Sequence, residues 1–123
     1  MTDISKETFK LPWPPSANHY WFIVACKGGG RKVIGKKGKL FRENVKELLG
    51  ERTPHTCRLG IKLDVYPPDR RKRDLDNLLK ATLDALECGG LYGDDNQIDD
   101  IQITRKSVKK GGEIVITLRS LEE

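Results

Sequence analysis

Residues 58–90, RLGIKLDVYPPDRRKRDLDNLLKATLDALECGG, contain two different apolar patterns on either side of a charged turn. In residues 58–67 the apolar side chains alternate, which predicts a half-buried strand: Leu59, Ile61, Leu63 and Val65. From Asp74 onward the apolar residues are spaced by three and four, which predicts a helix over residues 74–88. Asp74 is a favourable N-cap residue and Gly89 is a favourable stop.

The rest of the chain supplies further strands and one more helix. Four more strands are predicted, within residues 8–16, 19–26, 98–110 and 111–121. A glycine turn joins the last two. Residues 38–50 have helical spacing, and the triplet KVI before them is a candidate return strand of a hairpin. The order strand, hairpin, helix, strand, helix, strand, strand predicts one α+β domain over residues 1–123, with two main helices on one face of a mixed sheet in two layers.

Composition narrows the class of protein. The chain has 123 residues and a formal net charge of +5, and 33% of its residues are charged, which favours a small globular domain with a nucleic-acid or phosphate partner. No stretch approaches the roughly 18 apolar residues of a membrane span, so no membrane partner is expected. The N-terminal residues lack the apolar region of a signal peptide, and the three cysteines form no C-x-x-C pair. We therefore expect a cytoplasmic protein without a disulfide or a zinc site.

Positive charge is concentrated in two segments. Residues 27–39, KGGGRKVIGKKGK, hold six cations and no acid, and the second segment adds four more: Arg70, Arg71, Lys72 and Arg73. We expect both to contact DNA phosphates, with Lys36 and Lys37 in the first; the alternative for residues 27–39 is a solubilising hairpin tip. The same segment nearly spells a phosphate loop, but Lys37 replaces the hydroxyl residue that binds Mg²⁺, and no good strand–loop–helix is expected around it. No nucleotide cofactor is therefore predicted.

Carboxylates stand directly beside the second basic segment. On the helix over residues 74–88, Asp76 and Lys80 are one turn apart on the polar face, and Asn77 lies at its edge. The simplest interpretation is a solvated face, with Asp74 as the helix cap and Asp76–Lys80 as a surface ion pair. A second acidic cluster follows the helix: Asp94, Asp95, Asp99 and Asp100. It does not match the pattern of an EF-hand calcium loop.

Acids beside cations are typical of a metal-dependent nuclease site. Nucleases use carboxylate-bound metals for in-line displacement at phosphate, and Mg²⁺ binds through one or two carboxylates. We expect Mg²⁺, with Mn²⁺ as a substitute, held by Asp74, Asp76 and a carboxylate from Asp94 or Asp95; the residues leave open whether Asp94 assists or replaces Asp95. About 18 Å separates Asp76 from the helix end at Cys88, so Asp95 returns to Asp76 only if the intervening segment runs back nearly extended. Otherwise the third carboxylate would come from a partner subunit.

Aromatic and histidine side chains offer weaker signals. Four aromatic residues are able to stack on bases, but their place beside prolines and a strand favours core packing: Trp13, Tyr20, Trp21 and Phe22. His55 and Cys57 are too few for a zinc site, so His55 is interpreted as polar surface.

The run PPDRRKRDLDNLLKATLDALECGGLYGDDNQIDD, residues 67–100, resembles the signature of RusA-type Holliday junction resolvases, small endodeoxyribonucleases common in phages and prophages. The likeness extends from LPWPPSANHYW to GGEIVITL and so covers nearly the whole chain. It implies a RusA-like fold and a metal-dependent homodimer that resolves four-way junctions in recombination and repair. The expected location is the cytoplasm of a bacterial host, with activity at the nucleoid.

The resemblance also implies site residues. The essential aspartates and the functional lysine of the family fall on Asp74, Asp76, Asp95 and Lys80. Arg73, Asn77 and Asn18 fall within matching motifs as DNA contacts, whereas residues 27–39 depart most from the family pattern. An isologous dimer would present two equivalent sites to a symmetrical junction. The alternatives are a non-catalytic branched-DNA-binding protein and a nuclease that acts on forks or flaps.

Overall fold

A computed structural model describes residues 6–16, 20–26 and 29–121, with the backbone alone for residues 22–26, 31 and 32. The strands are β1 (Lys6–Leu11), β2 (Trp21–Cys26), β3 (Gly29–Ile34), β4 (Leu59–Tyr66), β5 (Ile98–Arg105) and β6 (Glu113–Ser120). The helices are α2 (Lys36–Leu49), α3 (Leu75–Cys88) and the short 3-10 helix η1 (Asp95–Gln97). No helix among the described residues is long and apolar enough to cross a membrane.

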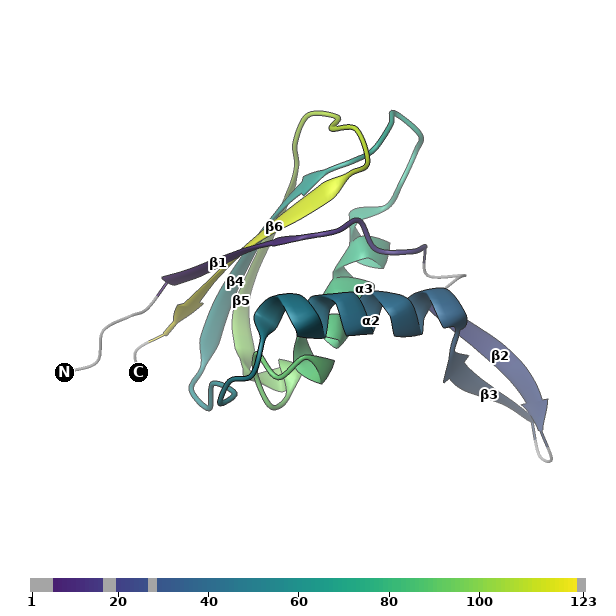
Figure 1. Ribbon diagram of the computed structural model, residues 1–123, viewed down its shortest axis with the longest axis horizontal. Coiled ribbons are helices and arrows are strands. Elements are labelled where there is room, and N and C mark those ends of the chain that lie inside the picture. Colours follow the sequence, from purple (N-terminus) through teal and green to yellow (C-terminus); the bar gives the residue numbers. More distant parts are fainter. Residues whose placement is uncertain (1–5, 17–19, 27–28, 122–123) are drawn as a thin grey trace.

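Four strands form one mixed sheet in the order β1-β6-β4-β5 (Figure 1). β4 is antiparallel to β6 and parallel to β5, and β1 is antiparallel to β6. Parallel neighbours need a crossover connection, and α3 supplies it between β4 and β5. β5 and β6 are consecutive strands, as expected, but they lie on either side of β4 instead of pairing with each other. The predicted two-layer α+β class with a mixed sheet is confirmed.

The core lies between one face of this sheet and the two long helices. Across β4 and β6, Leu63 is opposite Ile116 and Val65 is opposite Ile114, and all four are buried. α2 and α3 cover that face with these buried side chains: Phe41, Val45, Leu49, Leu78, Ala81, Ala85 and Leu86. Burial of this apolar surface is the main driving force for folding. The helical spacing therefore predicted the packed faces in part, because Leu40 and Leu48, which belong to the apolar pattern of α2, are exposed.

β2 and β3 form a separate antiparallel hairpin that projects from the body beside the N-terminal end of α2 (Figure 1). The KVI triplet is its return strand, as expected. α2 begins at Lys36 instead of Gly38, with Gly35 as the N-cap directly after β3. β3 therefore overlaps the near phosphate-loop sequence, residues 30–37, and only Gly35 separates it from α2. That leaves no loop of backbone N–H groups to surround a phosphate, in agreement with the expectation that no good strand–loop–helix surrounds this sequence.

Tyr20 fixes the base of this hairpin on the helices. Its ring is fully buried, its hydroxyl donates to the carboxylate of Asp84 in α3, and Arg42 in α2 donates to the same carboxylate at 2.8 Å. Burial, followed by the bond to Asp84, raises the pKa of the Tyr20 hydroxyl, which therefore stays protonated as a donor. A Cβ at Gly38 would lie 2.6 Å from the Tyr20 carbonyl oxygen, so α2 can begin this close to the hairpin only with glycine there.

Candidate metal and nucleic-acid site

The N-terminal turn of α3 presents charged side chains that the fold itself does not use. Asp74 occupies the N-cap with an extended backbone, yet its carboxylate makes no capping hydrogen bond. Asp76 and Lys80 are exposed, and among the described residues neither forms a hydrogen bond or an ion pair through its side chain. Neither the capping hydrogen bond of Asp74 nor the Asp76–Lys80 ion pair is formed. A purely structural role therefore does not explain these two acids. Negative charge at a helix N-terminus is favourable, so the two aspartates are tolerated there without a partner.

Asp69, which sequence analysis did not identify, organises the basic segment. Its Oδ1 accepts a hydrogen bond from the backbone N–H of Arg71 at 2.9 Å and from Nη1 of Arg73 at 2.8 Å. The Arg73 hydrogen bond, followed by that from Arg71, holds the pKa of the Asp69 carboxyl below its usual range. Arg105 donates to the Arg73 carbonyl at 2.6 Å. Arg73 is therefore partly buried and fixed in place, while the other three cations stay exposed: Arg70, Arg71 and Lys72. An acid four residues before an arginine was the available signal in the sequence.

Trp13 forms a wall beside this segment. The Arg73 guanidinium lies 5.6 Å from the centre of its ring. Gly112, with a positive φ of 74°, approaches so closely that a Cβ there would be 2.9 Å from Trp13 side-chain atoms. Trp13 packs against the core, as the sequence favoured. It also lines three surface hollows, of which two, with volumes of about 410 and 220 Å³, lie beside the basic segment. Tyr20 is fully buried and Trp21 partly buried, whereas the Phe22 side chain lies outside the described residues.

The second acidic segment lies at the other end of α3. The backbone N–H of Asp95 donates to Oε1 of Glu87 in the last turn of the helix at 3.0 Å. Asp94 is the N-cap of η1, and its Oδ1 accepts from the backbone N–H of Asn96 at 2.9 Å. Asp94 therefore has a structural role, whereas the exposed carboxylate of Asp95 accepts no hydrogen bond from any of the described residues. Two further acids pair with arginines, Asp99 with Arg58 and Asp100 with Arg119.

Asp95 belongs to a carboxylate cluster that does not include Asp74 or Asp76. Within the described part of the chain, one group of three or more His, Cys, Asp or Glu side chains has ligand atoms within 4.8 Å of one another: Glu87, Asp94 and Asp95. Partial burial raises the pKa of Glu87; the Asp95 hydrogen bond opposes this, and the charges of Asp95 and Asp94 raise the pKa further. Glu87 lies roughly 16 Å along the helix from Asp76, at about 1.5 Å per residue. One chain therefore does not bring Asp95 together with Asp74 and Asp76.

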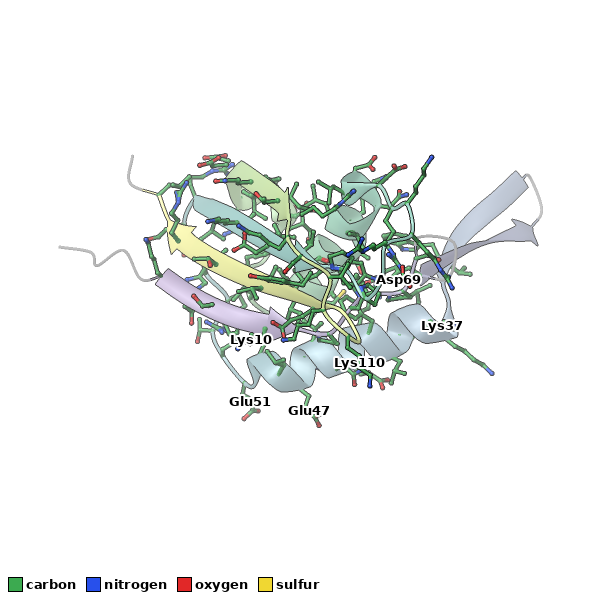
Figure 2. The ribbon with its side chains drawn as sticks, turned by 90° about the horizontal axis from the view of Figure 1, so that it is seen from above. Lys10, Lys37, Glu47, Glu51, Asp69 and Lys110 are labelled. Carbon is green, nitrogen blue, oxygen red and sulfur yellow. The ribbon has the colours of Figure 1, made fainter. Side chains whose placement is uncertain are left out.

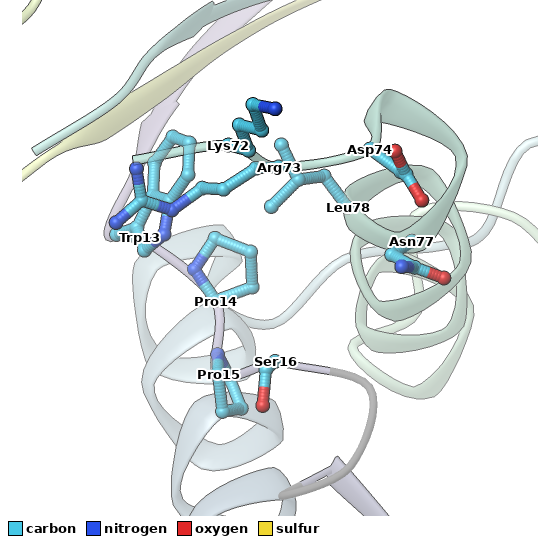
Figure 3. A pocket seen from close by; sticks show the side chains of 9 residues that line it. All are labelled: Trp13, Pro14, Pro15, Ser16, Lys72, Arg73, Asp74, Asn77 and Leu78. Atoms are coloured by element: carbon cyan, nitrogen blue, oxygen red, sulfur yellow. The ribbon is translucent and has the colours of Figure 1, made fainter. Parts of the chain in front are cut away.

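Three of the remaining predicted contact residues lie at the N-terminal ends of the helices: Lys36, Lys37 and Asn77. Lys36 and Lys37 are exposed in the first turn of α2, and Figure 2 shows Lys37 pointing away from the body, while Glu47 and Glu51 lie toward the other end of that helix. Asn77 is exposed and lines the larger hollow together with Asp74 (Figure 3). Asn18 lies outside the described residues.

Comparisons with known proteins identify the family of this chain. The family model described as "Endodeoxyribonuclease RusA" matches residues 12–119. Over 117 residues the chain is 38% identical to the crossover junction endodeoxyribonuclease rusA of Enterobacteria phage HK97, covering 93% of this chain and 94% of that relative. Over 118 residues it is 36% identical to the proteins of that name from Enterobacteria phage 82 and Escherichia coli (strain K12), covering 90% of this chain and 92% of each relative. The chain belongs to the RusA family of endodeoxyribonucleases.

Proposed function

We propose that this protein is a structure-selective endodeoxyribonuclease that resolves four-way (Holliday) DNA junctions by metal-dependent hydrolysis of a phosphodiester bond. The relatives bear the name crossover junction endodeoxyribonuclease, which supports this substrate class. The observation that carries the proposal is at the start of α3. There, Asp74, Asp76 and Lys80 are exposed and not engaged by the described fold, directly after a segment of four cations. The reaction would serve recombination and repair in the cytoplasm of a bacterial host.

The exposed aspartates fit a hard divalent cation, and we propose Mg²⁺, with Mn²⁺ as a substitute. Carboxylate oxygens are the protein ligands that Mg²⁺ prefers, and neither Asp74 nor Asp76 would have to give up a partner within the described fold to bind it. When bound, the ion lowers the pKa of a water molecule and stabilises charge on the scissile phosphate. Lys80, one turn after Asp76, acts as a fixed cation for that phosphate. The exposed cations of the preceding segment hold the flanking phosphates.

The third carboxylate of this site is, in our proposal, the partner's Asp95 in a homodimer. In one chain, the bond from Asp95 to Glu87 keeps it at the far end of α3 from Asp74. A two-fold axis that brings the start of α3 in one subunit to Asp95 in the other would create two equivalent sites. A four-way junction has pairs of equivalent strands, so such a dimer would nick two opposed strands. The Asp95 carboxylate accepts no hydrogen bond within the described residues and is exposed, as this role requires.

A cleavage assay tests the proposed function. Synthetic four-way junctions, forks and linear duplexes are incubated at one stated salt concentration with Mg²⁺, Mn²⁺ or a chelator, and the nicks are mapped. We expect paired symmetrical nicks in the junction, only with metal. Asp74→Asn should lower the cleavage rate by at least about 10²-fold, because it removes a carboxylate ligand. Junction binding should persist or tighten, because a negative charge beside the phosphate is lost.

The matched control is Asp94→Asn, which removes one charge from the other acidic segment. Asparagine is also a good N-cap residue, so η1 should keep its cap and cleavage should stay near the wild-type rate. Retained cleavage by Asp74→Asn would refute the metal site. Equal cleavage of forks or linear duplexes would refute the junction selectivity, and binding without any cleavage by the wild type would favour a purely binding protein.

A further inference from the structure

We propose that the larger hollow beside Asp74 receives one unstacked nucleobase of the strand that is cut. This inference rests on the proposed function. The hollow has a volume of about 410 Å³ and lies between the segment Trp13–Ser16 and the first turn of α3 (Figure 3). Small-molecule sites typically measure roughly 300–1,000 Å³, so the space suits a group of this size. Because Asp74 is one of its lining residues, the occupant would lie next to the proposed cleavage site.

The walls of the hollow favour a flat, mainly apolar group. Pro14 and Leu78 are buried residues that face it from opposite sides, and Pro15 continues the first wall (Figure 3). A nucleobase has two apolar faces that need such contacts once it leaves the stack, and proteins that extrude a base hold it between apolar or aromatic side chains. The proline-rich segment also loses little conformational freedom on binding, since the proline rings fix its backbone.

The polar groups in the hollow favour a base over a phosphate. The Asn77 side chain offers two donors and an acceptor, so it can pair with the edge of a base. Lys72 and Arg73 also line the hollow, but Arg73 is already paired with Asp69, and the Asp74 carboxylate would repel a phosphate that entered the same space. A neutral base with hydrogen-bonding edges is thus the part of a nucleotide that matches this lining.

A neighbouring hollow suits the phosphate backbone instead. It has a volume of about 220 Å³, and Trp13 and Arg73 line both spaces. Its cations are Arg70, Arg71, Arg105 and Lys106, all exposed. Arg73 is held between the two by Asp69 and by its contact with Trp13, so the wall is formed before DNA arrives. A strand that placed its phosphates on these cations would bring a base to the opening of the larger hollow.

The geometry of a four-way junction lowers the free-energy cost of removing a base from the stack. Removing a base from a regular duplex costs unstacking and unpairing free energy, and that cost is smallest where stacking is already interrupted. The strand-exchange point of a four-way junction is such a place. Base capture there would therefore favour a junction over linear duplex, and the polar lining would set which base flanks the cut.

The test compares intact junctions with junctions that carry an abasic residue at the nucleotide beside the mapped nick. The variant Ser16→Trp places a large ring in the hollow and should block the base. We expect the ratio of single-turnover cleavage rates, intact over abasic, to fall about ten-fold from the wild type to Ser16→Trp, as expected for loss of one base–protein stacking contact. Thr53→Trp, at an exposed position after α2, is the matched control and should keep the wild-type ratio.

A second measurement needs no variant. With a chelator present, wild-type protein is added to junctions that carry 2-aminopurine beside the nick or deep within one arm. Its fluorescence should rise only at the first position, because the base leaves the stack there. An unchanged rate ratio in a folded Ser16→Trp protein, or no fluorescence rise in a bound junction, would overturn this inference and leave the proposed function intact. Failure of the wild type to bind and cut any junction would overturn the proposed function, and this inference with it.

Discussion

Charged residues on the polar face of α3 look equivalent in the sequence but differ in what they contact. Asp84 accepts hydrogen bonds from Tyr20 and Arg42, and Glu87 accepts one from the backbone of Asp95. Asp76 and Lys80 have no such partner among the described residues. Exposed charges contribute little to stability, so Asp76 and Lys80 remain available for the ligand that we propose. Charged residues with partners in the fold thus lie in the second half of this helix face, and those without such partners lie in the first half.

Glu7 shows how a single residue outside the site links separate segments. Arg52 Nη2 lies 2.7 Å from both carboxylate oxygens of Glu7, and His55 Nε2 lies 2.8 Å from Oε1. His55 is therefore a hydrogen-bond partner of Glu7 and not simply polar surface. Burial by itself would raise the pKa of Glu7, but the hydrogen bonds from Arg52 and His55 outweigh it and lower the pKa from the ordinary value of 4.5.

The lowered pKa predicts a defined loss of stability in acid. A carboxyl whose pKa is lower in the folded state stabilises the protein above its unfolded pKa and ceases to do so as the pH falls through the folded pKa. The Tm difference between wild type and Glu7→Gln should therefore be present at about pH 5 and shrink steadily at lower pH. Thermal unfolding followed by circular dichroism measures it.

Glu47→Gln, at an exposed position on α2, controls for the loss of one negative charge. A Tm difference between wild type and Glu7→Gln that persists unchanged far below pH 4.5 would contradict the lowered pKa of Glu7.

At the scale of the element, α3 contains one polar side chain on its core face. Thr82 is fully buried and its Oγ1 has no hydrogen-bond partner within the described structure. A buried hydroxyl without a partner keeps its desolvation cost, so Thr82→Val, which has nearly the same shape, should raise the free energy of unfolding by about 1 kcal/mol. Denaturant titration measures this.

Thr82→Ser keeps the hydroxyl and removes the methyl group, so it should instead lower the free energy of unfolding by about 1 kcal/mol. A lower free energy of unfolding for Thr82→Val than for the wild type would contradict this prediction. It would mean that Oγ1 makes a hydrogen bond that compensates for its desolvation.

At the scale of the whole molecule, a site shared between subunits makes a prediction that a site within one chain does not. Asp74→Asn and Asp95→Asn should each abolish cleavage alone. In a mixed dimer, however, one site would combine the intact Asp74 of one subunit with the intact Asp95 of the other. Random mixing should restore about a quarter of the wild-type sites, because half of the dimers are mixed and each has one intact site.

The mixed sample should nick one strand of a junction and not two, which gel analysis of end-labelled strands distinguishes. Mixing two preparations of Asp74→Asn is the control and should restore nothing. If the mixture of different variants also stayed inactive while size-exclusion chromatography showed mixed dimers, the third carboxylate would belong to the same chain as Asp74.

Local patterns predicted the elements well, because alternation and helical spacing are properties of short segments. The alternating apolar residues of β4 indicate which side chains face the core, and the structure agrees. The leucine spacing of α3 does so in part: Leu78 and Leu86 are buried, but the buried face is completed by Ala81, Thr82 and Ala85, which lie outside the leucine pattern. The pairing of β5 with β4 instead of β6 depends on contacts between distant segments, which periodicity does not record. Asp69 and the Glu7–Arg52–His55 group were missed for the same reason, since their importance lies in partners that the chain brings together only on folding.

The sequence by itself determined which residue types are present for the proposed chemistry, and it predicted their roles: the acids and the lysine at the start of α3, the cations before it, and Asp95. Only the tertiary structure decided where Asp95 lies. After α3 the chain buries Leu91 and Tyr92, and the Tyr92 hydroxyl donates to the Leu83 carbonyl at 2.7 Å. That burial holds the following loop against the C-terminal half of the helix, because exposing two large apolar side chains would cost more free energy than an extended return path gains. The distance from Asp95 to Asp74 is therefore set by packing, and it is packing that points to a second subunit.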